Sequence, residues 1–210
     1  MKVQRALIAA LAVFCSAAAV AEEAKPTDNT PKLTHGLLMK QGGKLVFAPC
    51  RDRSYAIVDD VSAGGAVTKA LAGIGLEAGK KLYVELVGVV EGIDLKASAL
   101  NFARAEGRCQ APGGAEESWR AAGNEPGWSL VAGGDKVTLQ RKGKPDVTVP
   151  FATMKAEGNV AAYEAVQGPN RLALRFEKGV CRDKAADVLL GWSASVTVNG
   201  ETLKGCAWQR

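Results

Sequence analysis

The stretch Trp192-Ser-Ala-Ser-Val-Thr-Val-Asn-Gly-Glu-Thr-Leu-Lys-Gly-Cys206 decides how the end of the chain folds. At its centre, Asn199-Gly200 is the dipeptide preferred in two-residue type I′ turns, because both positions need a positive φ. The runs on either side alternate as strands do. A two-residue turn places Ser193 opposite Cys206, so the second strand delivers a cysteine to the sheet. We therefore predict a disulfide-stapled β-hairpin that closes a small β domain.

The N-terminus predicts export. Lys2 and Arg5 precede an apolar run, and Ala19-Val-Ala21 forms a small-residue cleavage site, so residues 1–21 are identified as a secretory signal peptide. One alternative is a lipoprotein acylated at Cys15, which the bulky residue before it disfavours. The other is a retained transmembrane helix, for which the apolar run is too short. We expect the mature chain in the periplasm, without stable membrane insertion.

Composition narrows the possible partners. Cleavage after Ala21 leaves 189 of the 210 residues and reduces the formal net charge from +5 to +3. The mature chain is thus only mildly basic, and it has no stripe of Lys and Arg with interleaved aromatic residues. We expect no nucleic-acid binding.

Four cysteines follow the predicted signal peptide: Cys50, Cys109, Cys181 and Cys206. An even number in an oxidising compartment indicates two disulfides, for which three pairings are possible. Pairing Cys50 with Cys109 and Cys181 with Cys206 keeps each bridge inside one predicted domain. Each bridge then stabilises its domain by roughly 3 to 4.5 kcal/mol. The alternative, a redox-active pair, lacks the Cys-x-x-Cys spacing.

The first half of the mature chain predicts an OB-like β domain. Residues 22–31 are polar and rich in turn formers, which is typical of a flexible leader. Residues 32–110 follow, with three strands, one helix and two further strands expected at 36–40, 45–50, 54–59, 66–74, 81–90 and 97–105. This is the order of an OB-type five-stranded barrel with its helix between strands three and four.

The second half predicts a separate antiparallel domain. Residues 111–117 continue a break in periodicity that begins at Gln110, and we interpret them as a linker. Residues 118–210 contain short strands at 127–131, 136–141, 146–151, 161–166 and 171–176, followed by the closing hairpin. Strands at this spacing favour a small antiparallel β-barrel or sandwich. The predicted fold class is therefore mainly β, with two disulfides.

Three motifs carry a resemblance to known proteins: Gly123-Asn-Glu-Pro-Gly-Trp128, Gly179-Val-Cys-Arg-Asp183 and Leu203-Lys-Gly-Cys206. Together they resemble a family of uncharacterised Gram-negative envelope proteins, whose members are labelled as lipoproteins or membrane proteins. The resemblance covers roughly the second half, and the first half is similar to small OB-like domains that accompany such modules. Gly127 and Lys184-Ala185 depart from the family pattern, where an aromatic residue and Gly-Met are common. The resemblance implies an envelope location and this fold, and it brings no established reaction.

The chain offers little for catalysis or for holding a metal or cofactor, and we expect neither. Its one histidine, His35, follows the leader, where a catalytic site lacks preorganised surroundings. One histidine and oxidised cysteines supply few metal ligands. Carboxylates do pair at Asp59-Asp60 and at Asp183 and Asp187. Turn and cap roles are the simpler interpretation of these residues, and carboxylate-dependent hydrolysis is the alternative.

The best candidate for ligand binding is the group Asn124, Glu125 and Trp128. Pro126 stiffens the start of a strand, Glu125 offers a carboxylate and Trp128 offers a flat stacking surface. This combination suits a sugar or the edge of a peptide. The competing interpretation is a structural corner, in which Trp128 belongs to the core and Asn124 hydrogen-bonds the turn.

The sequence thus favours a non-catalytic periplasmic protein that binds or maintains part of the envelope. Its partner is an envelope protein, a glycan or a small molecule. A second hypothesis is an inhibitor of a secreted hydrolase such as lysozyme, since small stapled β proteins suit that task. The charge of +3 counts against this second hypothesis, because a cationic lysozyme attracts acidic partners.

Overall fold

The computed structural model describes residues 29–105, 107–109 and 117–210, except for the side chains of residues 155 and 156. The predicted signal peptide with Cys15, residues 22–28 of the predicted leader and residues 111–116 of the predicted linker lie outside the described residues.

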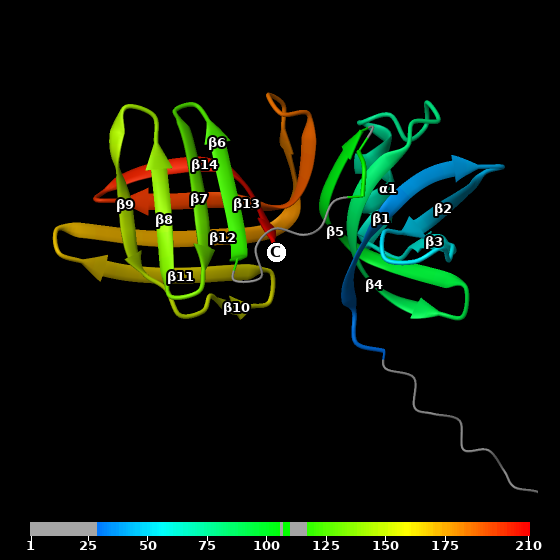
Figure 1. The fold of residues 1–210 in the computed structure, drawn as a ribbon, viewed down its shortest axis with the longest axis horizontal. Coiled ribbons are helices and arrows are strands. Elements are labelled where there is room, and N and C mark those ends of the chain that lie inside the picture. The colour runs from blue at the N-terminus through cyan, green and yellow to red at the C-terminus, as the bar shows by residue number, and fades with distance from the viewer. Residues whose placement is uncertain (1–28, 106, 110–116) are drawn as a thin grey trace, which may run out of the picture.

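A closed five-stranded barrel forms the first half (Figure 1). Its elements are β1 (Lys32–Gln41), β2 (Lys44–Pro49), β3 (Ala56–Asp60), the 3-10 turn η1 (Ala63–Gly65), α1 (Ala66–Ala72), β4 (Leu82–Glu91) and β5 (Asp94–Ala105). The strands pair in the circular order β1-β2-β3-β5-β4-β1, and the β3–β5 pair is parallel. The helix stands between β3 and β4. The predicted OB-like barrel is confirmed.

A carboxylate of the preceding strand accepts a hydrogen bond from the first turn of the short helix α1. Asp60 Oδ2 accepts the Thr68 N–H at 2.7 Å, and Ser62 Oγ accepts the Val67 N–H at 3.1 Å. The Ser62 N–H donates to Asp60 Oδ1 at 3.0 Å. Burial would by itself raise the pKa of Asp60, but the hydrogen bonds from Ser62 and Thr68 outweigh burial and lower the pKa. Asp60 is therefore a helix-capping residue, in agreement with the cap role expected for it.

Replacing Asp60 with alanine should reduce the free energy of unfolding by about 1–2 kcal/mol, because the first turn of α1 loses its acceptor. The effect should depend on pH. The folded pKa of Asp60 is lowered, so its carboxylate stabilises the fold above the unfolded pKa of about 3.9. That stability is lost as the pH falls through the folded pKa. Denaturant titrations at neutral and at acidic pH measure both effects.

Asp59→Ala serves as the matched control for Asp60→Ala. The Asp59 carboxylate is exposed and lies 3.3 Å from Lys96 Nζ, a surface ion pair of small energetic value. An equal loss of stability in both variants would contradict the capping role of Asp60.

The second half is a single antiparallel sheet that folds over itself. Its strands are β6 (Glu117–Asn124), β7 (Gly127–Gly133), β8 (Lys136–Arg141), β9 (Lys144–Pro150), β10 (Lys155–Glu157), β11 (Val160–Gln167), β12 (Asn170–Asp183), β13 (Val188–Val198) and β14 (Glu201–Gln209). Neighbours follow the order β10-β11-β12-β13-β14-β6-β7-β8-β9. In Figure 1 the strands β6 to β9 cross in front of β11 to β14, and the two layers enclose the core.

Side-chain contacts close the seam between the two ends of this sheet. No backbone ladder joins β9 to β11 in the described chain. Instead, the Tyr163 hydroxyl donates to the Pro150 carbonyl at 2.7 Å, and its ring lies 5.0 Å from the Phe151 ring, centroid to centroid. The second half is thus a rolled sheet with a tyrosine across its seam, which fits the predicted antiparallel barrel or sandwich.

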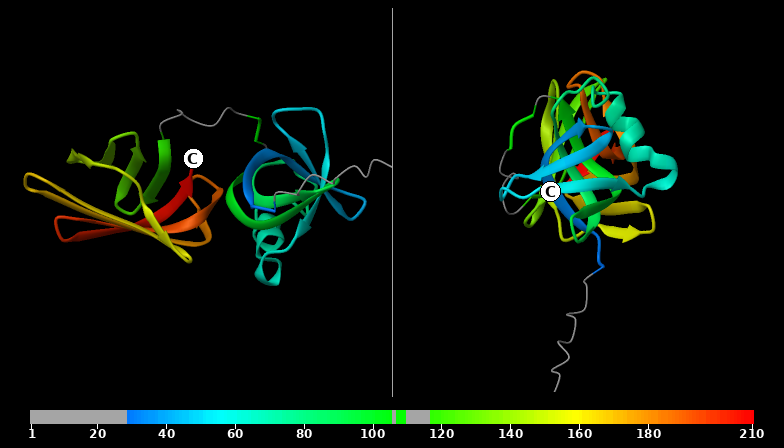
Figure 2. Two further views of the ribbon diagram at one scale, coloured as in Figure 1. Left: turned by 90° about the horizontal axis from the view of Figure 1, so that it is seen from below. Right: turned by 90° about the vertical axis from the view of Figure 1, so that its right-hand side faces the viewer.

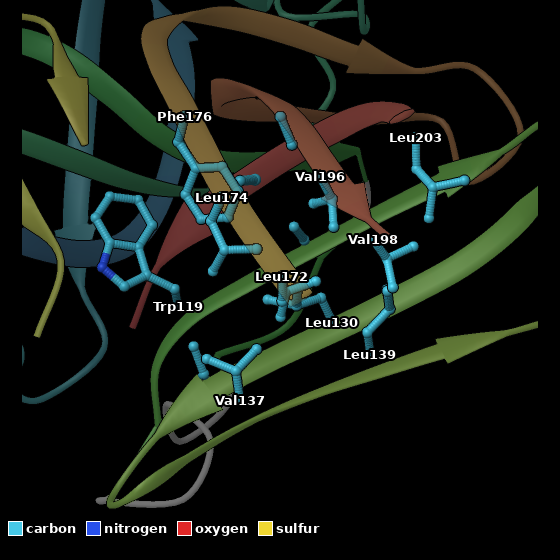
Figure 3. Packing of buried hydrophobic residues seen from close by; sticks show 14 of the residues in the cluster. Trp119, Leu130, Val137, Leu139, Leu172, Leu174, Phe176, Val196, Val198 and Leu203 are labelled. Atoms are coloured by element: carbon cyan, nitrogen blue, oxygen red, sulfur yellow. The ribbon is translucent and has the colours of Figure 1, made fainter. Parts of the chain in front are cut away.

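Alternating side chains from both layers fill the core of the second half (Figure 3). Trp119 of β6 lies 5.3 Å from the Phe176 ring and 5.1 Å from the Trp192 ring, centroid to centroid. Leu130 and Leu139 enter from the same layer as Trp119, and Phe176 and Trp192 come from the other layer. Burial of these large apolar side chains is the main source of stability in this half.

The closing hairpin and both disulfides are as predicted. Asn199 and Gly200 have positive φ values of 49° and 88°, and Ser193 pairs with Cys206 across β13 and β14. The bridges join Cys50 to Cys109 and Cys181 to Cys206, with Cα–Cα distances of 5.4 and 5.6 Å.

The junction between the halves is a feature that the sequence pattern did not indicate. β13 begins at Val188, and its first residues pair with Phe102–Arg104 of β5. Leu189 enters the hydrophobic core of the first barrel. The hairpin of β12 and β13, orange in Figures 1 and 2, therefore lies against β5 and joins both halves into one continuous sheet.

A buried polar network reinforces this junction. Glu85 and Asn101 are only 6% and 3% exposed. The Asn101 amide donates to Glu85 Oε2 at 2.7 Å and to the Gln209 carbonyl at 2.8 Å, and it accepts the Gln209 N–H at 2.9 Å. The Tyr83 hydroxyl donates to Glu85 Oε1 at 3.1 Å, and burial followed by the nearby Glu85 charge raises the pKa of Tyr83 to about 12. Side chains of the first barrel thus hold the last strand of the chain.

Candidate functional site

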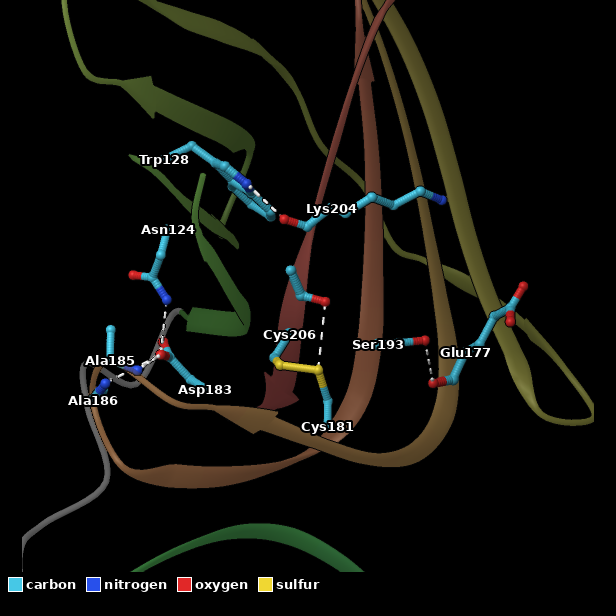
Figure 4. Close-up of a disulfide and its surroundings, with 11 residues drawn as sticks. Asn124, Trp128, Glu177, Cys181, Asp183, Ala185, Ala186, Ser193, Lys204 and Cys206 are labelled. Carbon is cyan, nitrogen blue, oxygen red and sulfur yellow. Dashed lines mark hydrogen bonds between the residues drawn. A yellow bond between two sulfur atoms is a disulfide. The ribbon is translucent and has the colours of Figure 1, made fainter. Parts of the chain in front are cut away.

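The three motif segments, far apart in sequence, line one pocket of about 450 Å³. We call it the motif pocket; its lining residues are Ala122–Glu125, Cys181–Ala185 and Lys204–Cys206. The first segment is the end of β6, the second is the end of β12 with the loop that follows, and the third belongs to β14. The Cys181–Cys206 disulfide joins two of these walls covalently (Figure 4).

A hydrogen-bonded corner joins the first two walls. Asn124 Nδ2 donates to Asp183 Oδ1 at 2.8 Å, and the same oxygen accepts the N–H groups of Ala185 and Ala186 at 2.9 and 3.1 Å. Asp183 is therefore a turn-forming carboxylate, as the simpler interpretation expected. Asn124 does not bond its own turn; it bridges β6 to the loop after β12 (Figure 4).

Trp128 supports the pocket from beneath. Its side chain is 5% exposed, and its Nε1–H donates to the Lys204 carbonyl at 3.1 Å. The ring lies under two glycines: a Cβ at Gly123 would be 2.2 Å from Trp128 Nε1, and one at Gly205 would be 2.8 Å from Trp128 Cζ2. Trp128 is thus a core residue, and its faces are not open to a ligand as a stacking surface requires. The structural corner considered from the sequence is thus correct for Trp128 but not for Asn124, which bonds Asp183 instead of its own turn.

Two charged side chains at the motif pocket have no ion-pair or hydrogen-bond partner among the described residues. Arg182 Nη2 pairs with Asp187 Oδ1 at 2.9 Å, and Lys204 Nζ donates to Ser195 Oγ at 3.0 Å. In contrast, the exposed Glu125 and Lys184 have no ion pair or hydrogen bond to any described residue. A carboxylate and an ammonium group are therefore both available to a bound molecule.

The motif pocket extends past Lys204 along the outer face of the sheet. A second hollow of about 310 Å³ shares Lys204 and Gly205 with it and continues over Ser193 and Ser195 to Arg175 and Glu177. Figure 4 shows Ser193 and Glu177 on this far side of the disulfide. The two hollows are therefore neighbours at Lys204 and Gly205, and hydroxyl and charged side chains contribute to the walls of the second.

A larger hollow of about 770 Å³ lies elsewhere, beside β11. Tyr163, Glu164 and Arg175 contribute to its walls. None of the three motif segments reaches it, and its Arg175 also pairs with Glu177 at 2.8 Å. Size alone would favour this hollow as a binding site. We favour the motif pocket, because three separate segments converge there around a covalent cross-link.

The other sequence candidates lie apart from the motif pocket. Asp59 and Asp60 belong to β3 of the first barrel. Asp59 pairs with Lys96, and Asp60 caps α1. His35 is half-buried on β1, opposite Glu85 of β4. Among the described residues, no three His, Cys, Asp or Glu side chains gather closely enough to hold a metal ion.

Sequence reasoning missed three contributors to the site: Lys184, Lys204 and Gly205. Each lies within or next to a motif that contains a cysteine. This proximity to a motif was the one feature of the sequence that could have identified them. Their meeting depends on the Cys181–Cys206 bridge and on the bulge in β12 between Lys178 and Cys181. Neither the facing direction of these side chains nor the bulge is visible from alternation in the sequence.

Comparisons with protein-family models, curated proteins and solved structures give no match for this chain. Within the described residues, no helix has the length and hydrophobicity needed to cross a bilayer.

Proposed function

We propose that the protein is a non-catalytic binding protein of the periplasm, and that the motif pocket holds its ligand. The observation that carries this proposal is the convergence of three separate segments on one pocket, with a disulfide in its wall. The resemblance to envelope proteins rests on the same three segments, so the residues that suggest the family are also those that build the pocket.

The walls of the motif pocket are fixed before any ligand arrives. The disulfide, the Asn124–Asp183 bond and the Trp128–Lys204 bond hold its three sides together. A site whose walls are already in place loses little conformational entropy on binding. The free carboxylate of Glu125 and ammonium of Lys184 then suit a partner that presents groups of both charges, on an envelope protein, a glycan or a small molecule.

The two disulfides support the proposed location. Cys50–Cys109 and Cys181–Cys206 fit an oxidising compartment such as the periplasm, since disulfides seldom persist in a reducing cytoplasm. Export by the predicted signal at residues 1–21 belongs to the same proposal.

A photo-cross-linking side chain placed at Glu125 should capture the ligand in the native periplasm. A variant carrying the same group at Lys136 is the matched control, because Lys136 is also an exposed, charged position but lies outside the motif pocket. We expect a product at position 125 that is absent at position 136. Adding Lys184→Ala should reduce the yield at position 125, because one of the two free charges is lost.

The result also separates the competing functions. A captured secreted hydrolase whose activity falls on binding would make the protein an inhibitor. Turnover of an ester, peptide or glycan by the purified protein that Glu125→Gln abolishes would contradict a non-catalytic role. Equal capture at positions 125 and 136 would reject the motif pocket as the ligand site.

A further inference from the structure

The Cys50–Cys109 disulfide gathers exposed arginines from two distant parts of the chain. Arg51 and Arg53 follow Cys50 in the loop between β2 and β3, and Arg108 precedes Cys109 after β5. We call these three residues the arginine cluster. Because the cysteine Cα atoms are 5.4 Å apart, the Cα atoms of Arg51 and Arg108 lie no more than about 13 Å apart.

Few negative charges of the described residues compensate the arginine cluster. All three arginines are exposed, and the side chain of Arg51 is 83% accessible. Among the described residues, the one carboxylate paired with the cluster is Asp52, whose Oδ2 lies 3.3 Å from Arg51 Nε. Asp52 Oδ1 is occupied by the Ser54 N–H at 2.9 Å and by the Ser54 hydroxyl. No carboxylate of the described residues lies within 4.0 Å of Arg53 or Arg108.

Exposed apolar side chains accompany the cluster at this end of the barrel. Tyr55, two residues after Arg53, is 69% exposed. Leu33, 45% exposed, precedes His35 on β1, whose carbonyl accepts the Cys50 N–H at 3.1 Å. Transfer of such side chains from water to the boundary between headgroups and acyl chains lowers the free energy, and tyrosine is enriched at that boundary.

We propose that the arginine cluster, with Leu33 and Tyr55, is a docking surface for an anionic lipid bilayer. Guanidinium groups bind the phosphates of the headgroups, often through two parallel N–H donors. The two apolar side chains enter the interface between headgroups and acyl chains. The combination favours a lipid surface over a soluble polyanion, which has no layer to receive Leu33. This peripheral binding requires no spanning segment, and it uses a different part of the molecule from the motif pocket.

Partitioning of the mature chain, residues 22–210, onto vesicles tests the proposal. We expect binding to vesicles containing phosphatidylglycerol, little binding to pure phosphatidylcholine, and steep weakening as salt rises above about 0.1 M. Each arginine near an anionic surface strengthens binding about fivefold. The variant Arg51→Ser/Arg53→Ser/Arg108→Ser should therefore bind roughly 100-fold more weakly.

A variant with the same loss of charge elsewhere is the control. Lys136→Ser/Lys142→Ser/Arg171→Ser removes three exposed cations from the second half, and it should keep most of the vesicle binding. Leu33→Ser/Tyr55→Ser should retain the salt dependence but lose the binding that persists at high salt. The altered side chains are exposed, so unfolding midpoints close to that of the unmodified chain are expected for all three variants.

Several outcomes would overturn the proposal. One is equal binding to neutral and anionic vesicles, and another is an equal loss in the cluster and control variants. Inorganic polyphosphate that binds the cluster more tightly than vesicles do, without any contribution from Leu33 and Tyr55, would assign the cluster to a soluble polyanion instead.

Discussion

Replacing Gly205 with alanine should reduce the free energy of unfolding of the second half by about 3 kcal/mol, the upper end of the usual cost of overpacking. A Cβ at this position would lie 2.0 Å from the Ala122 carbonyl oxygen and 2.7 Å from its carbon. The obstacle is the backbone of β6, which pairs with β14 at Cys206, the next residue. Relief of the overlap therefore requires the two strands to separate where the sheet turns between its layers.

Tryptophan fluorescence during urea unfolding measures this effect. All four tryptophans lie in the second half, so their signal reports its unfolding rather than that of the first barrel. Gly179→Ala is the control, because a Cβ at Gly179 would have no atom within 4 Å. We expect a much lower midpoint for Gly205→Ala and a nearly unchanged one for Gly179→Ala. Equal midpoints for the two variants would show that β6 and β14 have more room than the structure indicates.

Replacing Asn101 with leucine should reduce the free energy of unfolding by about 3–5 kcal/mol, because the polar contacts at the junction between the halves are lost. Leucine has a similar size but no hydrogen-bonding group. The Gln209 N–H and carbonyl would lose their Asn101 partners, and the buried Glu85 carboxylate would lose its Nδ2 donor. The cost is large because the buried carboxylate would keep only the Tyr83 hydroxyl as a side-chain donor, and the part-buried groups of Gln209 would lose their Asn101 partners.

A double-mutant cycle with Glu85→Leu separates the network from simple packing. The Glu85→Leu/Asn101→Leu variant no longer buries a carboxylate that has lost its Asn101 donor, so its loss of stability should be smaller than the sum of the two single losses. Amide hydrogen exchange of Gln209 should also accelerate in Asn101→Leu, because its N–H loses its acceptor. Additive losses with unchanged exchange at Gln209 would mean that Asn101 acts only by filling space.

Local rules predicted much of the fold. Asn199-Gly200 determines the hairpin because few other dipeptides accept positive φ at both turn positions. The order of strands and helix in residues 32–110 was sufficient for the five-stranded barrel, since strand length and alternation are local properties. The cysteine pairing followed from keeping each bridge within one half.

Interactions between distant segments were not predictable in the same way. The segment Gly179–Asp183 contains glycine and charges and gave no strand signal, yet it is the end of β12.

β4 did carry a signal in the run Leu82–Leu86, which is buried throughout rather than on alternate residues. Such a run indicates a strand covered on both faces. Glu85 within it marks the buried contact between the halves.

In the candidate site, too, the local patterns were predictable and the contacts between distant segments were not. Asn124, Glu125 and the cysteine segments were recognised as motifs, but their meeting in the motif pocket depends on tertiary contacts. The orientation of Trp128 depends on Gly123 and Gly205, which leave room for its ring beneath the strands. A tryptophan beside a proline and a carboxylate reads equally well as a binding surface or as a core residue, and only the three-dimensional neighbours decide.

The pairing of β5 with β13 bears on the order in which the chain can fold. A chain that is synthesised N-terminus first presents the whole first barrel before residues 188–209 appear. During that interval the edge of β5 at Phe102–Arg104 has no partner, and Asn101 has no Gln209 to bind. An unpaired strand edge is a site for mispairing with other chains. The last residues to arrive are thus the ones that protect the first domain to form.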